Sequence, residues 1–246
     1  MNLTQYRVDF FFGFVGAGIY NIGAVLFLQF ILAKIDTVAG WDVYDMIFLH
    51  GVGQFWAYLY FFITFPNTDN FNDLVSEGEM DSILLKPMDS MFLATIRKVD
   101  FLSLIALLQP IAIISYPLFK KDYDITISTV FLAAVLTFGT IVISHLIEVM
   151  LSSIAFWTIR SELGRMFTRT AQVASYPYEI FRSRIAKIFF FAIAPYAVII
   201  NVPFRALINK LDYRLILLEV VLLMFFFILS RFVWNQGLKK YQSVSS

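Results

Sequence analysis

The chain has 246 residues, of which 59% are hydrophobic and only 15% are Asp, Glu, Lys or Arg, and Phe alone accounts for 28 of them. Because ordinary soluble proteins are about 45 to 50% apolar and about 25% charged, this composition and a mean hydropathy of +0.75 predict an integral membrane protein. A net charge of +1 without a basic run excludes a nucleic-acid surface, and the absence of Cys excludes disulfides, thiolate metal sites and Cys nucleophiles.

Six apolar runs predict an all-α integral membrane protein with six transmembrane helices in a single transmembrane domain, residues 1–246. A helix needs about 20 apolar residues to cross a hydrocarbon layer about 30 Å thick. The predicted spans are 10–33, 46–66, 101–119, 125–147 with an extension to 159, 186–203 and 215–233. The fifth run is short and contains Pro195 and Pro203, so a broken or re-entrant helix near its outer end is the alternative to a full span.

Small and polar residues stand out in the first two spans. Small side chains in the first span allow another helix to approach closely. They are Gly13, Gly16, Ala17 and Gly23. We expect them to pack within the subunit, with pairing to a second chain as the alternative. In the second span His50 and Gln54 lie one turn apart, and they could line a substrate cavity or hydrogen-bond to a neighbouring helix.

The distribution of basic residues predicts the orientation. With six spans both termini lie on one side, and that side holds thirteen of the 19 Lys and Arg residues. Basic residues are enriched in cytoplasmic loops. We therefore expect both termini and the loop 67–100 on the cytoplasmic side of the cell membrane. The segment 160–187, with six basic residues, is counted on this side as an anchor, and a contact surface for a cytoplasmic partner is the alternative.

The loop between the second and third spans predicts a short amphipathic helix. Ser76 and Glu79 have the spacing of a capping box, in which each side chain accepts a backbone N–H at the start of a helix. Pro87 prevents the helix from continuing. The apolar residues share one face: Met80, Ile83 and Leu84. Such a helix could rest on headgroups or dock onto a cytoplasmic partner, and its acidity argues against an anionic leaflet.

Four stretches resemble one family. "GEMDSILLKP" at 78–87 resembles the G-x-(L/M)-D-x-x-L-x-K-P signature of a subgroup of ABC-2-type transporter permeases. "SIAFW" at 153–157, "YPYEIFRSRI" at 176–185 and "IAPYAVIINVP" at 193–203 resemble the same subgroup, in the same order. The one departure is Met80, where leucine is commoner, and this swap nearly conserves volume.

The resemblance implies a six-helix permease of a cell membrane, of prokaryotic type. Such a permease pairs with a second permease, identical or homologous, and is driven by a cytoplasmic dimer of ABC ATPases that binds ATP and Mg. The short helix would couple the permease to the ATPase. That role falls on Gly78, Glu79, Met80, Asp81, Leu84, Leu85, Lys86 and Pro87.

This chain has no G-x-x-x-x-G-K-(S/T) loop to hold nucleotide phosphates. We therefore expect it to be a transport subunit and not an enzyme, to bind no cofactor, and to rely on a separate ATPase. His145 and Glu148 lie three residues apart near the inner end of the fourth span, too few ligands for a metal site. We favour an interfacial pair that reaches headgroup water, and a polar point on the substrate path is the alternative.

Glu219, near the outer end of the last span, has the same two interpretations. It could pair with Arg214 or Arg205 at the outer surface, which we favour, or line the substrate path.

Together these features predict the membrane-spanning subunit of an ATP-driven exporter. Its substrate would be apolar or amphipathic, such as a drug, lipid or peptide, moved by alternating access. The alternative is an ATP-independent secondary transporter coupled to protons or sodium through Glu148 or Glu219. A lipid-modifying enzyme is a third possibility, but the sequence places no acid, base and nucleophile together on one predicted membrane face.

Overall fold

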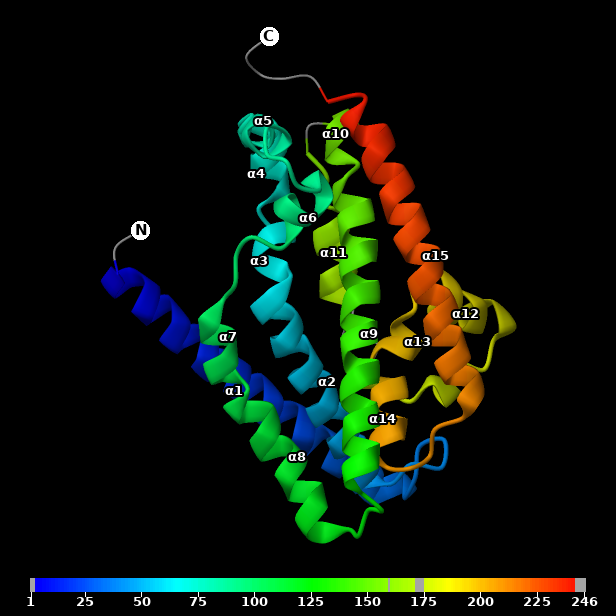
Figure 1. Cartoon of the computed structure of the whole chain (residues 1–246). Helices are drawn as coiled ribbons and strands as arrows, with labels where there is room; N and C mark the ends of the chain where they lie inside the picture. Colours follow the sequence, from blue (N-terminus) through cyan, green and yellow to red (C-terminus); the bar gives the residue numbers. More distant parts are fainter. Residues whose placement is uncertain (1–2, 159, 171–174, 242–246) are drawn as a thin grey trace.

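The computed structural model describes residues 3–158, 160–170 and 175–241, and within these ranges the secondary structure is helical (Figure 1). Among the described residues five helical stretches are long and apolar enough to cross a membrane, and a bent pair is either a sixth, broken span or a re-entrant loop. The candidate spans are Phe10–Ile35, Val43–Ile63, Phe101–Lys120, Ile127–Thr158 and Tyr213–Leu238. The predicted all-α membrane fold is confirmed. Ile159, where the fourth span was expected to end, lies outside the described residues.

The helices follow in chain order and are mostly short between the spans. The bounds are α1 Leu3–Ile35, α2 Val43–Ile63, α3 Phe65–Thr68, α4 Phe71–Ser76, α5 Glu79–Leu84, α6 Ser90–Thr95, α7 Phe101–Ala106, α8 Leu108–Lys120, α9 Ile127–Ser152, α10 Ala155–Thr158, α11 Leu163–Thr170, η2 Tyr178–Ile180, α12 Arg184–Ile188, the π-helix η3 Phe189–Ile193, α13 Tyr196–Ile199, α14 Asn201–Leu207 and α15 Tyr213–Leu238.

Polar side chains mark where several long helices begin. The Asp42 carboxylate accepts the backbone N–H of Asp45 at 2.9 Å, which starts α2. Thr126 accepts the N–H of Thr129 at 3.3 Å at the start of α9, and Asp212 does the same for α15. Each cap satisfies an N–H that has no partner within the helix. Short polar residues next to apolar runs therefore set these boundaries.

The core of the molecule surrounds α9. This helix packs against α15, α14 and α11, and α2 packs against α8 and α7. Figure 1 shows α9 along the long axis, with α15 on one side and α2 on the other. In the most apolar windows of α2 and of the α9 span, 50% of the residues are buried. These two helices therefore form the interior of the bundle.

The first helix lies at the periphery. Only 6% of its most apolar window is buried, and it crosses the bundle obliquely in Figure 1. A Cβ atom placed on Gly13, Gly16 or Gly23 would meet no atom within 4 Å. Our expectation that these glycines pack within the subunit is therefore wrong. Gly16 and Gly23 are exposed, and Gly13 lies at a groove between α1, α2 and α7.

The fifth span is broken, as its prolines predicted. The stretches Arg184–Ile193 and Tyr196–Leu207 meet at an angle of 70°. Pro195 lies at the break, where its ring removes a backbone donor and prevents the helix from running straight. The second stretch is buried from Tyr196 to Ala206 beside α9, and the first is largely exposed.

The segment 160–187 does not stay on one side, contrary to our prediction. Its first part, α11, folds back against α9. Its second part reaches α14, because Glu179 forms an ion pair with Arg205 and the Asn201 side chain bonds to the backbone of Tyr176 at 3.0 Å. Glu179 and Arg205 were expected on opposite sides of the membrane. The count of basic residues could not detect a segment that folds back into the bundle.

Candidate functional site

Residues 71–95 form a compact helical arm at the end of the molecule where α10 and the last turns of α15 also lie, at the top of Figure 1. We name α4, α5 and α6 the coupling arm. The predicted short helix is present as α5, and it ends before Pro87. Inside the arm, Met80 and Ile83 are 0% and 2% exposed. Of the apolar face predicted from the sequence, Met80 and Ile83 therefore pack against the rest of the arm, and Leu84 does not.

The predicted capping box is wrong. Ser76 is the last residue of α4, and no side chain caps α5. Gly78 precedes α5 with φ of 76°, in the left-handed region that only Gly adopts without strain. The Glu79 carboxylate pairs with Arg97 at 3.1 Å. The chain turns sharply between α4 and α5, so Ser76 belongs to α4 and does not cap α5. Gly78 of the motif provides the backbone conformation that this turn requires.

The tip of the arm is apolar and exposed. Leu84 is 43% exposed, Leu85 87% and Met88 57%, and Lys86 and Pro87 are exposed between them. Exposed apolar clusters on a surface commonly mark interaction sites. The residues of the motif thus divide into two groups: Met80 stabilises the arm, and the sequence from Leu84 onward is presented outward.

The arm is attached to α15 through one aromatic cluster. Trp234 is fully buried, and its ring lies 5.6 Å from Phe71 of α4 and 5.3 Å from Phe156 of α10. Its indole N–H donates to the Ser90 hydroxyl at 3.1 Å. Arg231, one turn earlier, pairs with Asp89 at 2.6 Å. The arm and the end of α15 therefore form one packed unit.

The pKa values of two ionisable groups at the arm are shifted by their surroundings. Burial alone would raise the pKa of Asp89, but the Phe92 amide and Arg231 lower it overall. Burial, together with the neighbouring carboxylate of Asp81, raises the pKa of Tyr241 to about 12. Asp81 of the motif thus lies beside the segment that follows α15.

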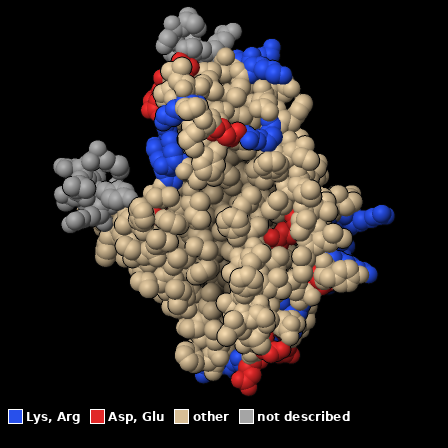
Figure 2. Space-filling view, viewed as in Figure 1, with Lys and Arg blue, Asp and Glu red and all other residues tan. Residues whose placement is uncertain are grey.

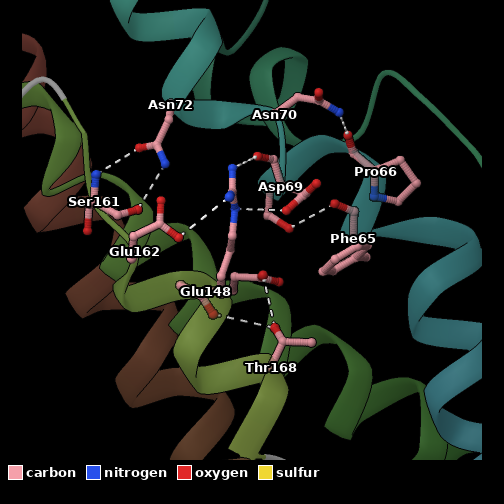
Figure 3. A network of polar contacts seen from close by, with 12 residues as sticks. Phe65, Pro66, Asp69, Asn70, Asn72, Glu148, Ser161, Glu162 and Thr168 are labelled. Carbon is pink, nitrogen blue, oxygen red and sulfur yellow. Dashed lines mark hydrogen bonds and ion pairs between the residues drawn. The ribbon is translucent and has the colours of Figure 1, made fainter.

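Below the arm, a polar network joins α3 and α4 to α11 and α9 (Figure 3). The side chain of Asn72 makes two hydrogen bonds to the backbone of Ser161, at 3.0 and 2.8 Å. Arg165 of α11 binds the Asp69 carboxylate at 2.9 Å and the Asp69 carbonyl at 3.1 Å. These contacts join residues about 90 positions apart. Movement of the arm would therefore reach α11 directly.

Glu148 lies at the centre of this junction. It is 1% exposed, it accepts hydrogen bonds from the hydroxyls of Tyr60 and Thr168, and the latter is 3.0 Å away. His145 faces another way and contacts the Thr95 hydroxyl of α6 at 3.1 Å. The favoured interpretation, an interfacial pair that reaches headgroup water, is wrong. The reason is that α6 covers His145 and α11 covers Glu148.

A groove of about 350 Å³ opens between α1, α2, α3 and α11, and we name it the amphipathic groove. Its aromatic wall includes Trp56, Tyr58 and Phe65, and its polar wall includes Asp69, Arg165 and Arg169. The volume lies in the range of about 300 to 1,000 Å³ that small-molecule sites occupy. Such a groove can hold a molecule with an apolar part and a polar part.

Of the predicted path residues, the structure brings some to this region and not others. Gln54 lines the amphipathic groove, and so does Ala17, which was predicted to serve helix packing. His50 lines a smaller cavity that shares Tyr20 with it, and its Nε2 atom contacts the Asn21 side chain at 3.2 Å. Both alternatives offered for His50, a cavity and a neighbouring helix, thus apply. His145 lies away from the groove, and Glu148 lies behind its wall, linked through Tyr60 and Thr168.

Glu219 is far from this groove, between α15 and α9. It is 4% exposed, its carboxylate faces Gly139, and one oxygen has no hydrogen-bond partner among the described residues. The favoured pairing with Arg205 or Arg214 is wrong. Arg205 pairs instead with Glu179 and lies over the rings of Trp41 and Tyr178, at 4.8 and 4.3 Å.

The arginines of α11 are the site residues that sequence reasoning missed. Arg165 and Arg169 are four apart, so they share one helical face. That spacing was visible in the basic segment, but the segment was interpreted as an anchor. Asp69, Asn72 and Thr168 carry no such signal, because their partners are distant in sequence.

Charged side chains gather at the two ends of the molecule in Figure 2, with a wide uncharged belt between them and a smaller charged group on one flank. This belt, the long apolar helices and the broken pair define a multi-pass membrane protein with a groove open between its helices. The model of the ABC-2 family transporter proteins matches residues 19–245, and the chain belongs to this family. No curated protein and no solved structure matches the chain.

Proposed function

We propose that the chain is the membrane-spanning subunit of an ATP-driven ABC exporter, and that the coupling arm docks onto a cytoplasmic ATPase dimer that binds ATP and Mg. The observation that carries this proposal is the exposed tip of the arm. Leu84, Leu85 and Met88 present an exposed apolar surface on an arm whose interior is well packed. An apolar surface of this kind requires a partner to remove it from water.

Movement of the ATPase would be transmitted to the substrate groove through the polar network of Asp69, Asn72, Ser161 and Arg165. A displaced arm moves Asp69 and Asn72, which hold Arg165 and Ser161 at the two ends of a short segment. Because Arg165 also lines the amphipathic groove, movement of the arm changes the shape of the groove. ATP binding would thus close the groove on one side and open it on the other. An apolar or amphipathic substrate would leave the cell by alternating access.

A second permease, identical or homologous, would complete the transporter. The support for it is α1, whose most apolar window is only 6% buried and where a Cβ on Gly16 or Gly23 would meet no atom of the described chain within 4 Å. Small residues on an exposed helix face allow close packing with another helix in lipid. We assign Gly16 and Gly23 to this contact.

The test is ATPase binding and stimulation by the purified, reconstituted permease. Leu85→Asp places a charge at the apolar tip, and we expect it to abolish both binding and stimulation. Leu85→Met keeps the apolar surface and should retain them. Because Leu85 is 87% exposed, both variants should fold. If Leu85→Asp retains full stimulation, the arm is not the docking site.

The same proteoliposomes separate this proposal from ion-coupled transport. Vesicles containing this chain alone, with an imposed proton or sodium gradient and no ATPase, should show no transport. Gradient-driven transport under those conditions would identify a secondary transporter and overturn the proposal.

A further inference from the structure

The amphipathic groove has an unpaired positive charge. Arg165 is neutralised twice, by Asp69 at 2.9 Å and by Glu162 at 3.5 Å. Arg169 lies one turn further along α11, is exposed, and makes no hydrogen bond or ion pair with any described residue. The undescribed residues 171–174 contain no carboxylate. The two carboxylates and two guanidinium groups balance in number, but both carboxylates contact Arg165, so Arg169 is left without an acceptor among the described residues.

The remaining walls suit an apolar chain. Trp56 is fixed, because its indole N–H donates to the Thr140 hydroxyl at 3.1 Å and its ring stacks on Tyr60 at 5.2 Å. The groove shares Ala17, Tyr58 and Phe61 with a neighbouring groove of about 540 Å³ between α1, α2 and α7. That neighbour is lined mostly by apolar side chains, Phe10 and Phe14 among them.

We infer that the two grooves form a binding site for an anionic amphiphile from the membrane, with its negatively charged head on Arg169 and its tail along the aromatic walls. Guanidinium groups bind phosphate and carboxylate through paired hydrogen bonds, which an ammonium head cannot accept. A neutral amphiphile would bury the same apolar area but leave Arg169 unpaired. The site therefore discriminates by head charge, and binds the tail without regard to the head.

This inference names a substrate class for the proposed exporter, and rests on that function only for the direction of movement. The binding experiment uses the full chain in detergent and two probes with the same brominated acyl tail: a lysophosphatidylglycerol, which is anionic, and a monoacylglycerol, which carries neither a charge nor a phosphate. Bromine quenches Trp fluorescence on contact, and Trp56 is the reporter. Trp56→Phe should remove most of the quenching.

We expect the wild-type protein to bind the anionic probe more tightly, and Arg169→Gln to lose this preference through a roughly tenfold weaker affinity for that probe. Binding of the neutral probe should not change. Arg184→Gln is the matched control, because Arg184 is also exposed and lines neither groove. Tyr58→Ala, which alters the aromatic wall, should weaken both probes equally.

Three results would overturn the inference: equal affinity of the wild-type protein for both probes, an anionic preference that persists in Arg169→Gln, or displacement of the anionic probe by inorganic phosphate at equal concentration. The last would define a simple anion site. Failure of this binding-site inference can be distinguished from failure of the proposed function. A permease that stimulates its ATPase but shows no head preference loses only this site, whereas binding without any ATPase contact leaves the site and removes the export mechanism.

Discussion

Replacing Trp234 by Phe tests whether one indole ring attaches the coupling arm to the last membrane helix. Trp234 is 0% exposed, and its N–H donates to Ser90 at 3.1 Å. The variant loses this hydrogen bond, worth about 1 kcal/mol. It also leaves a cavity beside Phe71 and Phe156 where the larger ring had been, costing about 1 to 2 kcal/mol. The free energy of unfolding should therefore fall by about 2 to 3 kcal/mol.

The assay is thermal unfolding of the purified protein in detergent. For chains of this size 1 kcal/mol corresponds to about 2 to 4 °C, so the variant should unfold about 4 to 12 °C lower. Trp157→Phe is the control, because Trp157 is 44% exposed and such substitutions usually change stability by less than about 0.5 kcal/mol.

A double-mutant cycle separates the hydrogen bond from the cavity. Ser90→Ala alone should cost about 1 kcal/mol, and adding it to Trp234→Phe should cost almost nothing more, because the bond is already lost. The reasoning is refuted if Trp234→Phe unfolds at the same temperature as Trp157→Phe, or if the effects of the two substitutions simply add.

Three further predictions use the same unfolding assay. Gly51→Leu should destabilise the fold by at least about 2 kcal/mol, because a Cβ at Gly51 lies 3.3 Å from a backbone nitrogen of α8, whereas Gly16→Leu should have little effect because its Cβ meets nothing. Asn72→Ala should cost about 2 kcal/mol, because it removes two buried hydrogen bonds to the backbone; an unchanged unfolding temperature would show that α11 is not held there. Burial alone would raise the pKa of Asp42, but Lys121 and backbone amides lower it below its ordinary 3.8, so the pair stabilises the fold at neutral pH and this contribution is lost as the pH falls through the lowered pKa. Asp42→Asn should thus reduce the free energy of unfolding at about pH 6 by less than about 1 kcal/mol, because Asp42 is partly exposed, and by much less at about pH 2; an equal loss at both values would contradict the assignment.

The fold was predictable where the signal is local. Runs of apolar residues predicted the all-helical membrane class, and Pro195 predicted the broken fifth helix. The short helix before Pro87 also followed from the sequence, because its periodicity and its stop lie within ten residues. Its cap did not, since the choice between Ser76 and Gly78 depends on how sharply α4 and α5 turn.

The site was not predictable, because its contacts join distant parts of the chain. Glu148 looks like an interfacial carboxylate until Tyr60, 88 residues earlier, and Thr168, 20 residues later, are brought to it. The pairing of Glu179 with Arg205 required η2 to lie beside α14, and no count of basic residues contains that information. The open face of α1 could not be seen either, since glycines at helical spacing allow packing but do not supply the partner.

The polar contacts of α1 impose an order on biosynthesis. The buried side chain of Asn21 is satisfied by His50, 29 residues later, and by Gln109, 88 residues later, and Gln109 also donates to the Phe14 carbonyl at 2.7 Å. At roughly 5 to 20 residues per second, the second partner leaves the ribosome roughly 4 to 18 s after Asn21, a separation of 88 residues. Until then α1 holds an unsatisfied amide, and it reaches its final place only when α8 has been synthesised.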